Sequence, residues 1–366
     1  MYVLGIAGTA KNTGKTTTTM ALLAAAEKVG HQVALTSIGY DGENLDNVTG
    51  LPKPRITMVE GSLVVTAKKC IPWGTAKLEV VEPLDDIRIP LGKMCIAKVI
   101  EAGTVVIAGP NKGSHLTKVI EKIAGYGADV FIVDGALNRI APMVRTQGII
   151  LATGAARNTD IERLALETGS LDTILNLPKA VGIIAETVKQ DGIAIISKQG
   201  REEYLTINSL AAASVSEQLA KKIEADTKTI IIPGVVDYGS FKRFLDICGE
   251  KLSGKTLIVQ DSIKILVGGS PIEVSQAIKH ANDLGFAIRV VNRLPLLLIT
   301  FNPFYPAYSF TDQSYSSAFV DKYKLEEALN LELRVPAVDV MKTSVDQIYL
   351  ELLKKLDKRD LETAAI

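Results

Sequence analysis

A segment of small and polar residues near the start of the chain separates two apolar stretches; it reads Gly8-Thr9-Ala10-Lys11-Asn12-Thr13-Gly14-Lys15-Thr16. The stretch before it, Tyr2–Ala7, is typical of a short buried strand, and the alanine-rich stretch after it, Thr17–Val29, is typical of a helix. Gly14 lets the backbone approach an anion closely, and the N–H groups that open the helix have no partners of their own. The spacing therefore predicts a phosphate-binding loop.

Several residues of this segment are candidate ligands of a nucleotide and its metal ion. Lys15 can reach the β- and γ-phosphates, and the Thr16 hydroxyl can bind Mg²⁺. We expect the rest of the binding site to come from Gly8, Thr9, Asn12, Thr13, Gly14 and Thr17. The alternative is a turn that happens to contain Lys and Thr, but strand, loop and helix all agree with phosphate binding.

Two acidic residues follow predicted strands. Asp134 ends the apolar run Phe131–Val133 and precedes Gly135, which matches a Walker B position, where a carboxylate holds the Mg²⁺ shell or an attacking water. Asp41 follows the expected strand His31–Ile38 and is a candidate for holding Mg²⁺ through water or for orienting the attacking group. Either Asp-Gly pair can instead be an ordinary turn. The predicted catalytic residues are Lys15, Asp41 and Asp134, and the predicted metal contacts are Thr16, Asp134 and Asp41.

Polar residues farther along the chain are weaker candidates. Asn138 and Arg139 follow the Asp134 strand, and Arg157 precedes an expected helix at Ile161–Thr168. Each could meet a phosphate, and each could equally be an exposed loop residue. The loop Gly109–Ser114 contains Asn-Lys but lacks the Asp that an Asn-Lys-x-Asp motif needs to recognise guanine. Its sequence therefore favours ATP over GTP.

The loop resembles that of dethiobiotin synthetase and related P-loop proteins. Five residues separate Gly8 from Gly14, which gives the longer form Gly-Thr-x-x-x-x-Gly-Lys-Thr, and Lys11 lies near the place of the second lysine that this class often carries. Asp134-Gly135-Ala136 is similar to the Glu-Gly-Ala of the synthetase. Base-binding loops of such proteins carry Asn near Pro, as Phe301–Pro306 does here, although partner contact or packing would also explain that segment.

The whole chain resembles the lysine 5,6-aminomutase reactivase subunit. The resemblance lies in the segments Gly8–Thr19, Ile38–Glu43, Val133–Arg139 and Thr153–Ser170. It implies an ATPase that releases damaged cobalamin from an adenosylcobalamin-dependent aminomutase, with the mutase and a second reactivase subunit as protein partners. Two alternatives remain open. One is a dethiobiotin-synthetase-like enzyme that activates a small-molecule carboxylate with ATP, and the other is a partitioning or scaffolding ATPase that forms a homodimer over nucleotide.

The alternation of apolar runs and helical patterns predicts an α/β fold, a P-loop NTPase with a mostly parallel sheet and a second α/β domain. We expect the nucleotide-binding domain at residues 1–178, with an irregular, proline-punctuated insertion at 44–95. Residues 179–366 would form the second domain, which we expect to bind a partner or substrate. Ser253-Gly254-Lys255-Thr256 is interpreted as a turn, because no strand precedes it and Thr256 opens a strand.

The composition excludes several classes of function. The chain has 366 residues with 41 basic and 41 acidic side chains, and only 5% of the residues are aromatic, so no electrostatic or stacking surface for nucleic acid is expected. Its three cysteines are scattered, which argues against a disulfide framework or a zinc site. No signal peptide and no run long enough to span a membrane is expected, so we predict a cytoplasmic protein.

Overall fold

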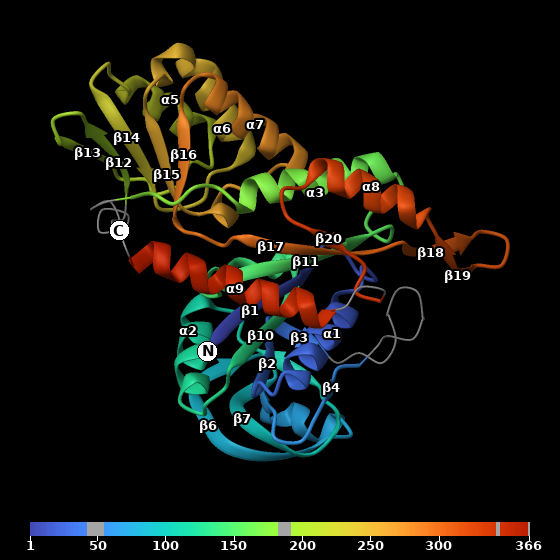
Figure 1. Cartoon of the computed structure of the whole chain (residues 1–366). Helices are drawn as coiled ribbons and strands as arrows, with labels where there is room; N and C mark the ends of the chain where they lie inside the picture. Colours follow the sequence, from blue (N-terminus) through green and yellow to red (C-terminus); the bar gives the residue numbers. More distant parts are fainter. Residues whose placement is uncertain (42–54, 182–191, 342–344, 365–366) are drawn as a thin grey trace. The chain divides into compact units, whose positions relative to one another are not determined.

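The computed structural model describes residues 1–41, 55–181, 192–341 and 345–364, and they fall into two compact units. The first unit combines residues 1–165 with 296–366, and the second contains residues 166–295 (Figure 1). The helix α3 (Ile161–Leu175) crosses this boundary along the chain. The second unit is therefore inserted into the sequence of the first.

The first unit is built on a nine-stranded sheet with the order β20-β17-β11-β1-β10-β2-β5-β7-β6. Its strands are parallel from β20 to β5, whereas β7 runs antiparallel to both β5 and β6. The bounds are β1 (Tyr2–Gly8), β2 (Val33–Ser37), β5 (Leu63–Ala67), β6 (Lys77–Ile89), β7 (Gly92–Glu101), β10 (Val130–Ala136), β11 (Gly148–Gly154), β17 (Leu296–Asn302) and β20 (Ala337–Val338).

Apolar residues of the central strands explain why this sheet is buried on both faces. Leu4 of β1 and Ile132 of β10 are fully buried in one core on one face, and their neighbours Val3 and Phe131, which point to the other face, are buried as well. Near-continuous apolar runs of this kind are expected for parallel strands that helices cover. The helices of this unit are α1 (Lys15–Lys28), α2 (Gly113–Ala124), α8 (Lys322–Glu332) and α9 (Val345–Ala364).

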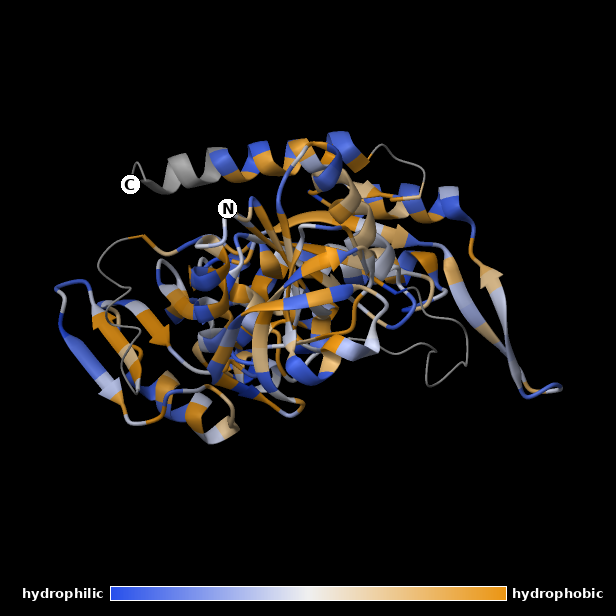
Figure 2. Cartoon of the chain, turned by 90° about the horizontal axis from the view of Figure 1, so that it is seen from below, coloured by the Kyte–Doolittle hydropathy of each residue, from blue (hydrophilic) through white to orange (hydrophobic). Residues whose placement is uncertain are grey.

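The C-terminal helix α9 packs against α1, and the coloured part of α9 in Figure 2 carries both apolar and polar residues. Tyr349 and Leu352 are buried on its inner side, and the Tyr349 hydroxyl lies 2.7 Å from His31 Nδ1. Tyr2 donates a hydrogen bond of 2.7 Å to Asp357. The predicted terminal helix is therefore docked on the first unit.

The strand β1 lies at the point where the strand order reverses. The chain leaves β1 through α1 to reach β2, two places away on one side, and later passes from β10 on that side to β11 on the other. Gly8 at the end of β1 is in register with Ala136 of β10 and with Ala152 of β11. In open α/β sheets, ligands bind at the carboxyl ends of the strands where the order reverses.

Short strands and 3₁₀ helices complete the first unit. Among the described strands, β18 and β19 pair only with each other, and their ribbon projects from the end of β17 (Figures 1 and 2). The bounds are β3 (Gly39–Asp41) paired with β9 (Ile107–Gly109), β4 (Thr57–Met58) paired with β8 (Gly103–Thr104), β18 (Phe304–Ser309), β19 (Ser314–Phe319), η1 (Lys68–Trp73), η2 (Leu137–Arg139) and η3 (Ala141–Arg145).

The second unit has a five-stranded sheet of its own, with the order β13-β12-β14-β15-β16. Strands β14, β15 and β16 are parallel, and Phe241, Phe244 and Phe286 fill the core beside them. The bounds are β12 (Ile193–Ser197), β13 (Glu202–Leu205), α5 (Ala213–Lys222), β14 (Thr227–Ile232), α6 (Tyr238–Cys248), η4 (Gly249–Leu252), β15 (Thr256–Asp261), η5 (Ser262–Lys264), α7 (Pro271–Asp283) and β16 (Ala287–Asn292).

The predicted fold class is confirmed: a large, mostly parallel sheet is accompanied by a second α/β unit. Thr256 begins β15 rather than a helix, as the interpretation of 253–256 as a turn requires. None of the described helices combines the length and the apolar character that crossing a membrane demands.

Two predicted boundaries need correction. Residues 296–366 were expected in the second domain, but β17 pairs with β11 and places them in the first unit. Residues 44–95 were expected to be an irregular insertion. Short strands or loops were expected there, and from residue 57 onward the segment does contain strands. However, β5, β7 and β6 are part of the main sheet rather than of an insertion, while residues 42–54 lie outside the described residues. Pro83 is tolerated in β6 because that strand is at the sheet edge.

Candidate functional site

The loop after β1 is folded for binding an anion. Gly14 precedes α1 with φ +89°, a left-handed conformation that favours glycine, and Asn12 has φ +63°. No side chain of the described residues caps the N-terminus of α1. Open amides together with the positive end of the helix dipole attract a phosphate.

Hydrogen bonds from neighbouring strands hold this loop in place. The Thr9 N–H donates to Ala152 O of β11 at 2.9 Å, and the Thr9 hydroxyl donates to Thr153 Oγ1 at 3.1 Å. Inside the loop, the Thr13 hydroxyl donates to Ala10 O at 2.9 Å. The predicted loop residues therefore stand together: Gly8 ends β1, Thr9, Asn12, Thr13 and Gly14 form the loop, and Lys15, Thr16 and Thr17 open α1.

An ion pair joins the loop to the predicted Walker B residue. Lys15 Nζ contacts Asp134 Oδ2, and the Thr19 hydroxyl donates to Asp134 Oδ1 at 3.1 Å. The Asp134 side chain is fully buried, and the Lys15 side chain is 17% exposed. The two residues meet because β1 and β10 are adjacent and parallel.

The donor set fits Mg²⁺ shared with a phosphate. The Thr16 hydroxyl in the first turn of α1 and the Asp134 carboxylate are hard oxygen ligands of the kind Mg²⁺ takes. The described residues contain no cluster of three or more His, Cys, Asp or Glu that could hold a metal by protein groups alone. Mg²⁺ commonly completes its shell with waters and phosphate oxygens, so one or two protein ligands suffice.

The structure places the backbone of Asp41 but not its side chain. Asp41 ends β3, where its backbone pairs with Ile107 of β9. Its side chain and Gly42 lie outside the described residues. Its predicted role toward Mg²⁺ or an attacking group stays a prediction.

A pocket of about 360 Å³ opens beside the loop and α1. Asn302, at the end of β17, connects its two sides: its amide Nδ2 donates to Asn12 O at 3.0 Å, and its Oδ1 accepts from the Phe304 N–H at 3.1 Å. The lining residues come from the loop and α1 on one side and from the C-terminal strands on the other: Thr13, Gly14, Thr17, Thr18, Thr300, Phe301, Asn302, Pro303, Phe319, Lys322, Asp339, Val340 and Met341.

Aromatic and charged groups face this pocket. Phe319, 66% exposed, lies against Phe304 with ring centroids 5.7 Å apart. Lys322 and Asp339 form an ion pair of 2.5 Å, with side chains 17% and 12% exposed. Phe319, Lys322 and Asp339 were not singled out from the sequence, whereas Phe304 lies in the segment Phe301–Pro306 that was interpreted as a candidate base-binding loop. Residues 109–114, used above to favour ATP, do not line the pocket.

The weaker candidates differ in their placement. Arg139 is exposed, and its guanidinium lies against Gly39 of β3, where a Cβ added to the glycine would be 2.5 Å from Arg139 Nη1. Asn138 and Arg157 are exposed, and the Arg157 N–H donates to Gly154 O at 2.8 Å. The structure thus puts Arg139 beside the strand that leads to Asp41.

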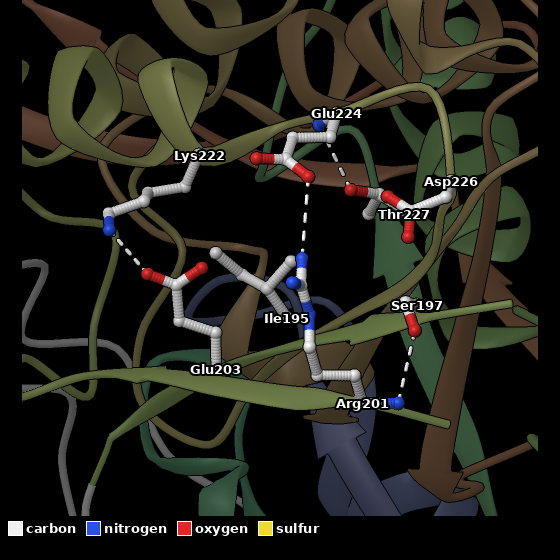
Figure 3. Close-up of a pocket in the computed structure, with 8 residues that line it drawn as sticks. All are labelled: Ile195, Ser197, Arg201, Glu203, Lys222, Glu224, Asp226 and Thr227. Carbon is white, nitrogen blue, oxygen red and sulfur yellow. Dashed lines mark hydrogen bonds and ion pairs between the residues drawn. The ribbon is translucent and has the colours of Figure 1, made fainter. Parts of the chain in front are cut away.

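A small hollow in the second unit offers no comparable site. It encloses about 10 Å³, which is room for a water molecule (Figure 3). Four of its five charged side chains pair with one another: Arg201 lies 3.4 Å from Glu224, and Lys222 contacts Glu203. This hollow therefore carries ion pairs of a solvated surface.

Together, these observations describe an α/β protein with a large, mostly parallel sheet and a glycine-containing loop between its first strand and first helix. No family model and no curated protein matches the chain. Among solved structures, it is similar to the signal recognition particle receptor FtsY from Elizabethkingia anophelis, with 11% sequence identity and a TM-score of 0.23. The match covers 90% of this chain and 65% of the receptor chain.

Proposed function

We propose that the chain binds Mg-ATP at the loop 8–16 and hydrolyses it. The observation that carries this proposal is the Lys15–Asp134 ion pair. Lys15 opens α1 directly after Gly14, which lines a pocket of about 360 Å³. A lysine and a buried carboxylate at this place are the groups that bind phosphates and a metal in phosphoryl transfer.

Each residue of the site then has a distinct task. On nucleotide binding, Lys15 would exchange its contact with Asp134 for one with the β- and γ-phosphates. Asp134, released from Lys15, and the Thr16 hydroxyl would hold Mg²⁺, which neutralises charge on the phosphates. Asp41 would orient the attacking water.

The nucleoside would occupy the pocket beside the loop. Pockets that bind small molecules are typically at least about 300 Å³, so the observed volume suffices. Phe319 offers a ring on which a base can stack, and the Lys322–Asp339 pair offers polar groups for a base edge or a ribose. The hydrogen bond from Asn302 to Asn12 would hold the loop in position next to the pocket.

We further propose that hydrolysis acts on a protein partner. The resemblance in the four segments named above supports an adenosylcobalamin-dependent aminomutase and a second reactivase subunit as partners, with release of damaged cobalamin as the outcome. None of the described residues of the second unit lines the pocket, and we assign the surface for such a partner to this unit.

The test is phosphate release by the purified protein with Mg-ATP or Mg-GTP, alone and with an inactivated aminomutase and its companion subunit. Release that prefers ATP, depends on Lys15 and rises with the partners supports the full proposal. If the rate of phosphate release does not change with the partners but rises with a small carboxylate, the result supports the synthetase-like alternative instead. If neither nucleotide binds the wild-type protein, the nucleotide site itself is refuted.

A further inference from the structure

Arg139 occupies a place from which it can act on a bound nucleotide. It ends the 3₁₀ helix η2, three residues after Ala136, the last residue of β10. Its side chain is exposed, and within the described part of the chain its guanidinium has no hydrogen-bond or ion-pair partner. An arginine without a carboxylate partner keeps all five of its N–H donors available for an anion.

The contact with Gly39 fixes where that guanidinium lies. Gly39 has φ +79°, and a Cβ there would be 2.5 Å from Arg139 Nη1 and 3.4 Å from its Cζ. Glycine is therefore needed both for the backbone conformation and for the close approach of the arginine. The Ser37 hydroxyl, which donates to Gly39 O at 2.6 Å, holds this backbone in turn.

Gly39, in β3, follows closely after β2, the strand of the main sheet that is next to the Asp134 strand β10. Asp134 is in register with Ser37, and the Ile38 N–H donates to Asp134 O at 2.6 Å. Gly39 is two residues beyond Ser37, a length that extended chain covers in about 7 Å. The side chain of Arg139 thus lies at the carboxyl ends of β2 and β10, where the outer phosphate of a nucleotide held by the loop would be.

We infer that Arg139 is a catalytic residue that stabilises the charge on the γ-phosphoryl group during its transfer. This inference rests on the proposed function. In hydrolysis, the water oxygen forms a bond to the γ-phosphorus, and the bond to the β,γ-bridging oxygen breaks with its electron pair left on ADP. The proton of the water passes to solvent, and Arg139 stays protonated throughout. Its charge opposes the negative charge that accumulates on the equatorial and leaving oxygens.

The chain offers a matched control in Arg145. This residue lies six positions later at the end of η3, is also exposed, and lies near Gly113 of α2 rather than near β3. Arg139→Gln and Arg145→Gln remove the same charge from the same segment. A difference between them therefore reports position rather than net charge.

The experiment measures the affinity of wild type and both variants for fluorescent Mg-ADP, without and with aluminium fluoride, which mimics the transferring phosphoryl group. We expect the three proteins to bind Mg-ADP with affinities within about threefold of one another. Aluminium fluoride should increase the Mg-ADP affinity of wild type and of Arg145→Gln by the same factor. In Arg139→Gln this increase should be at least about 100-fold smaller. Hydrolysis rates should follow the same pattern.

Each other result overturns a specific statement. The role of Arg139 is refuted if aluminium fluoride increases the Mg-ADP affinity of Arg139→Gln and of wild type equally. It is also refuted if wild type binds Mg-ADP but aluminium fluoride does not increase its affinity. A loss of Mg-ADP affinity equal to the loss with aluminium fluoride makes Arg139 a ground-state ligand and refutes its role in transfer. A wild type that does not bind Mg-ADP refutes the proposed function from which the inference starts.

Discussion

Lys15 and Asp134 are 119 positions apart in the chain and form an ion pair at the ends of two adjacent parallel strands. Asp134 is fully buried, so in the free protein Lys15 supplies the positive charge that this carboxylate needs. The same lysine is the residue expected to bind phosphates. The pair therefore links the stability of the free protein to the occupancy of the nucleotide site.

Removal of the lysine should affect both properties. We expect Lys15→Ala to abolish Mg-ATP binding in calorimetry and to lower the free energy of unfolding in urea by about 3 kcal/mol, because Asp134 is left buried without a cation. The double variant Lys15→Ala with Asp134→Asn should recover part of that stability but no binding. A single variant as stable as wild type would contradict the stabilising role of the pair.

The left-handed glycine of the loop can be tested against a glycine of equal geometry elsewhere. Gly14 has φ +89° and Gly30, after α1, has φ +80°. Alanine at either position should cost about 1 kcal/mol of stability. A Cβ at Gly30 would have nothing within 4 Å, so only Gly14→Ala should also weaken nucleotide binding. Equal affinities for Mg-ADP in the two variants would show that the loop backbone does not bind phosphate.

The part of the site that could be predicted from sequence is the part that is local. Strand, loop and Gly14-Lys15-Thr16 are contiguous, and the acid at Asp134 ends an apolar run whose length is that of a strand. Both motifs consist of residues that are close together in the sequence, and their local conformation is determined by the steric and hydrogen-bonding preferences of those residues. Their meeting in space required only that the two strands be adjacent.

The rest depended on pairing between distant segments. β17 returns to β11 after the whole second unit, and no local pattern distinguishes a strand that stays in one sheet from a strand that rejoins another. For that reason residues 296–366 were assigned to the second domain. The hydrogen bond from Asn302 to the loop depends on the same pairing of β17 with β11, so the sequence alone did not predict it.

Asn302 should couple the pocket to the loop. Asn302→Asp keeps an acceptor for the Phe304 N–H but turns an oxygen toward the Asn12 carbonyl in place of a donor. We expect a loss of about 1–2 kcal/mol of stability and an affinity for Mg-ADP about tenfold lower, which is about 1.4 kcal/mol. Unchanged affinity in calorimetry would mean that the loop keeps its form without this hydrogen bond.

The buried thiols should make the protein less stable at alkaline pH. Burial raises the pKa of Cys95 and of Cys248 to about 11 in the folded state, whereas an unfolded thiol has a pKa of about 8.5. The unfolded chain therefore loses protons first as the pH rises. This stabilisation is complete below about pH 8.5 and is lost as the pH rises toward 11.

Urea unfolding at pH 8 and at pH 10.5 measures this effect. The free energy of unfolding of wild type should fall by about 2 kcal/mol more than that of Cys248→Ala, because the variant lacks one of these groups, while lysines and tyrosines titrate alike in both. Equal losses in the two proteins would show that the Cys248 thiol ionises as readily in the folded chain as in the unfolded one.

A comparison of two phenylalanines in the β18–β19 ribbon can distinguish binding of the base from binding of the phosphates. Phe319 lines the pocket and is 66% exposed, whereas Phe310 is 88% exposed, lies in the turn between the two strands and does not line it. If the nucleoside stacks on Phe319, then Phe319→Ala should weaken Mg-ATP binding about tenfold or more, since stacking on an aromatic ring contributes roughly 1–3 kcal/mol per base. Phe310→Ala should bind Mg-ATP as wild type does.

Tripolyphosphate provides the control for this comparison, because it has the phosphates but no base. Its affinity should be the same in Phe319→Ala, Phe310→Ala and wild type. An equal loss of tripolyphosphate and Mg-ATP binding in Phe319→Ala would mean that the ring acts through the phosphate loop. Full Mg-ATP affinity in that variant would instead place the nucleoside outside this pocket, and Asn302 would then hold the loop without contacting the ligand.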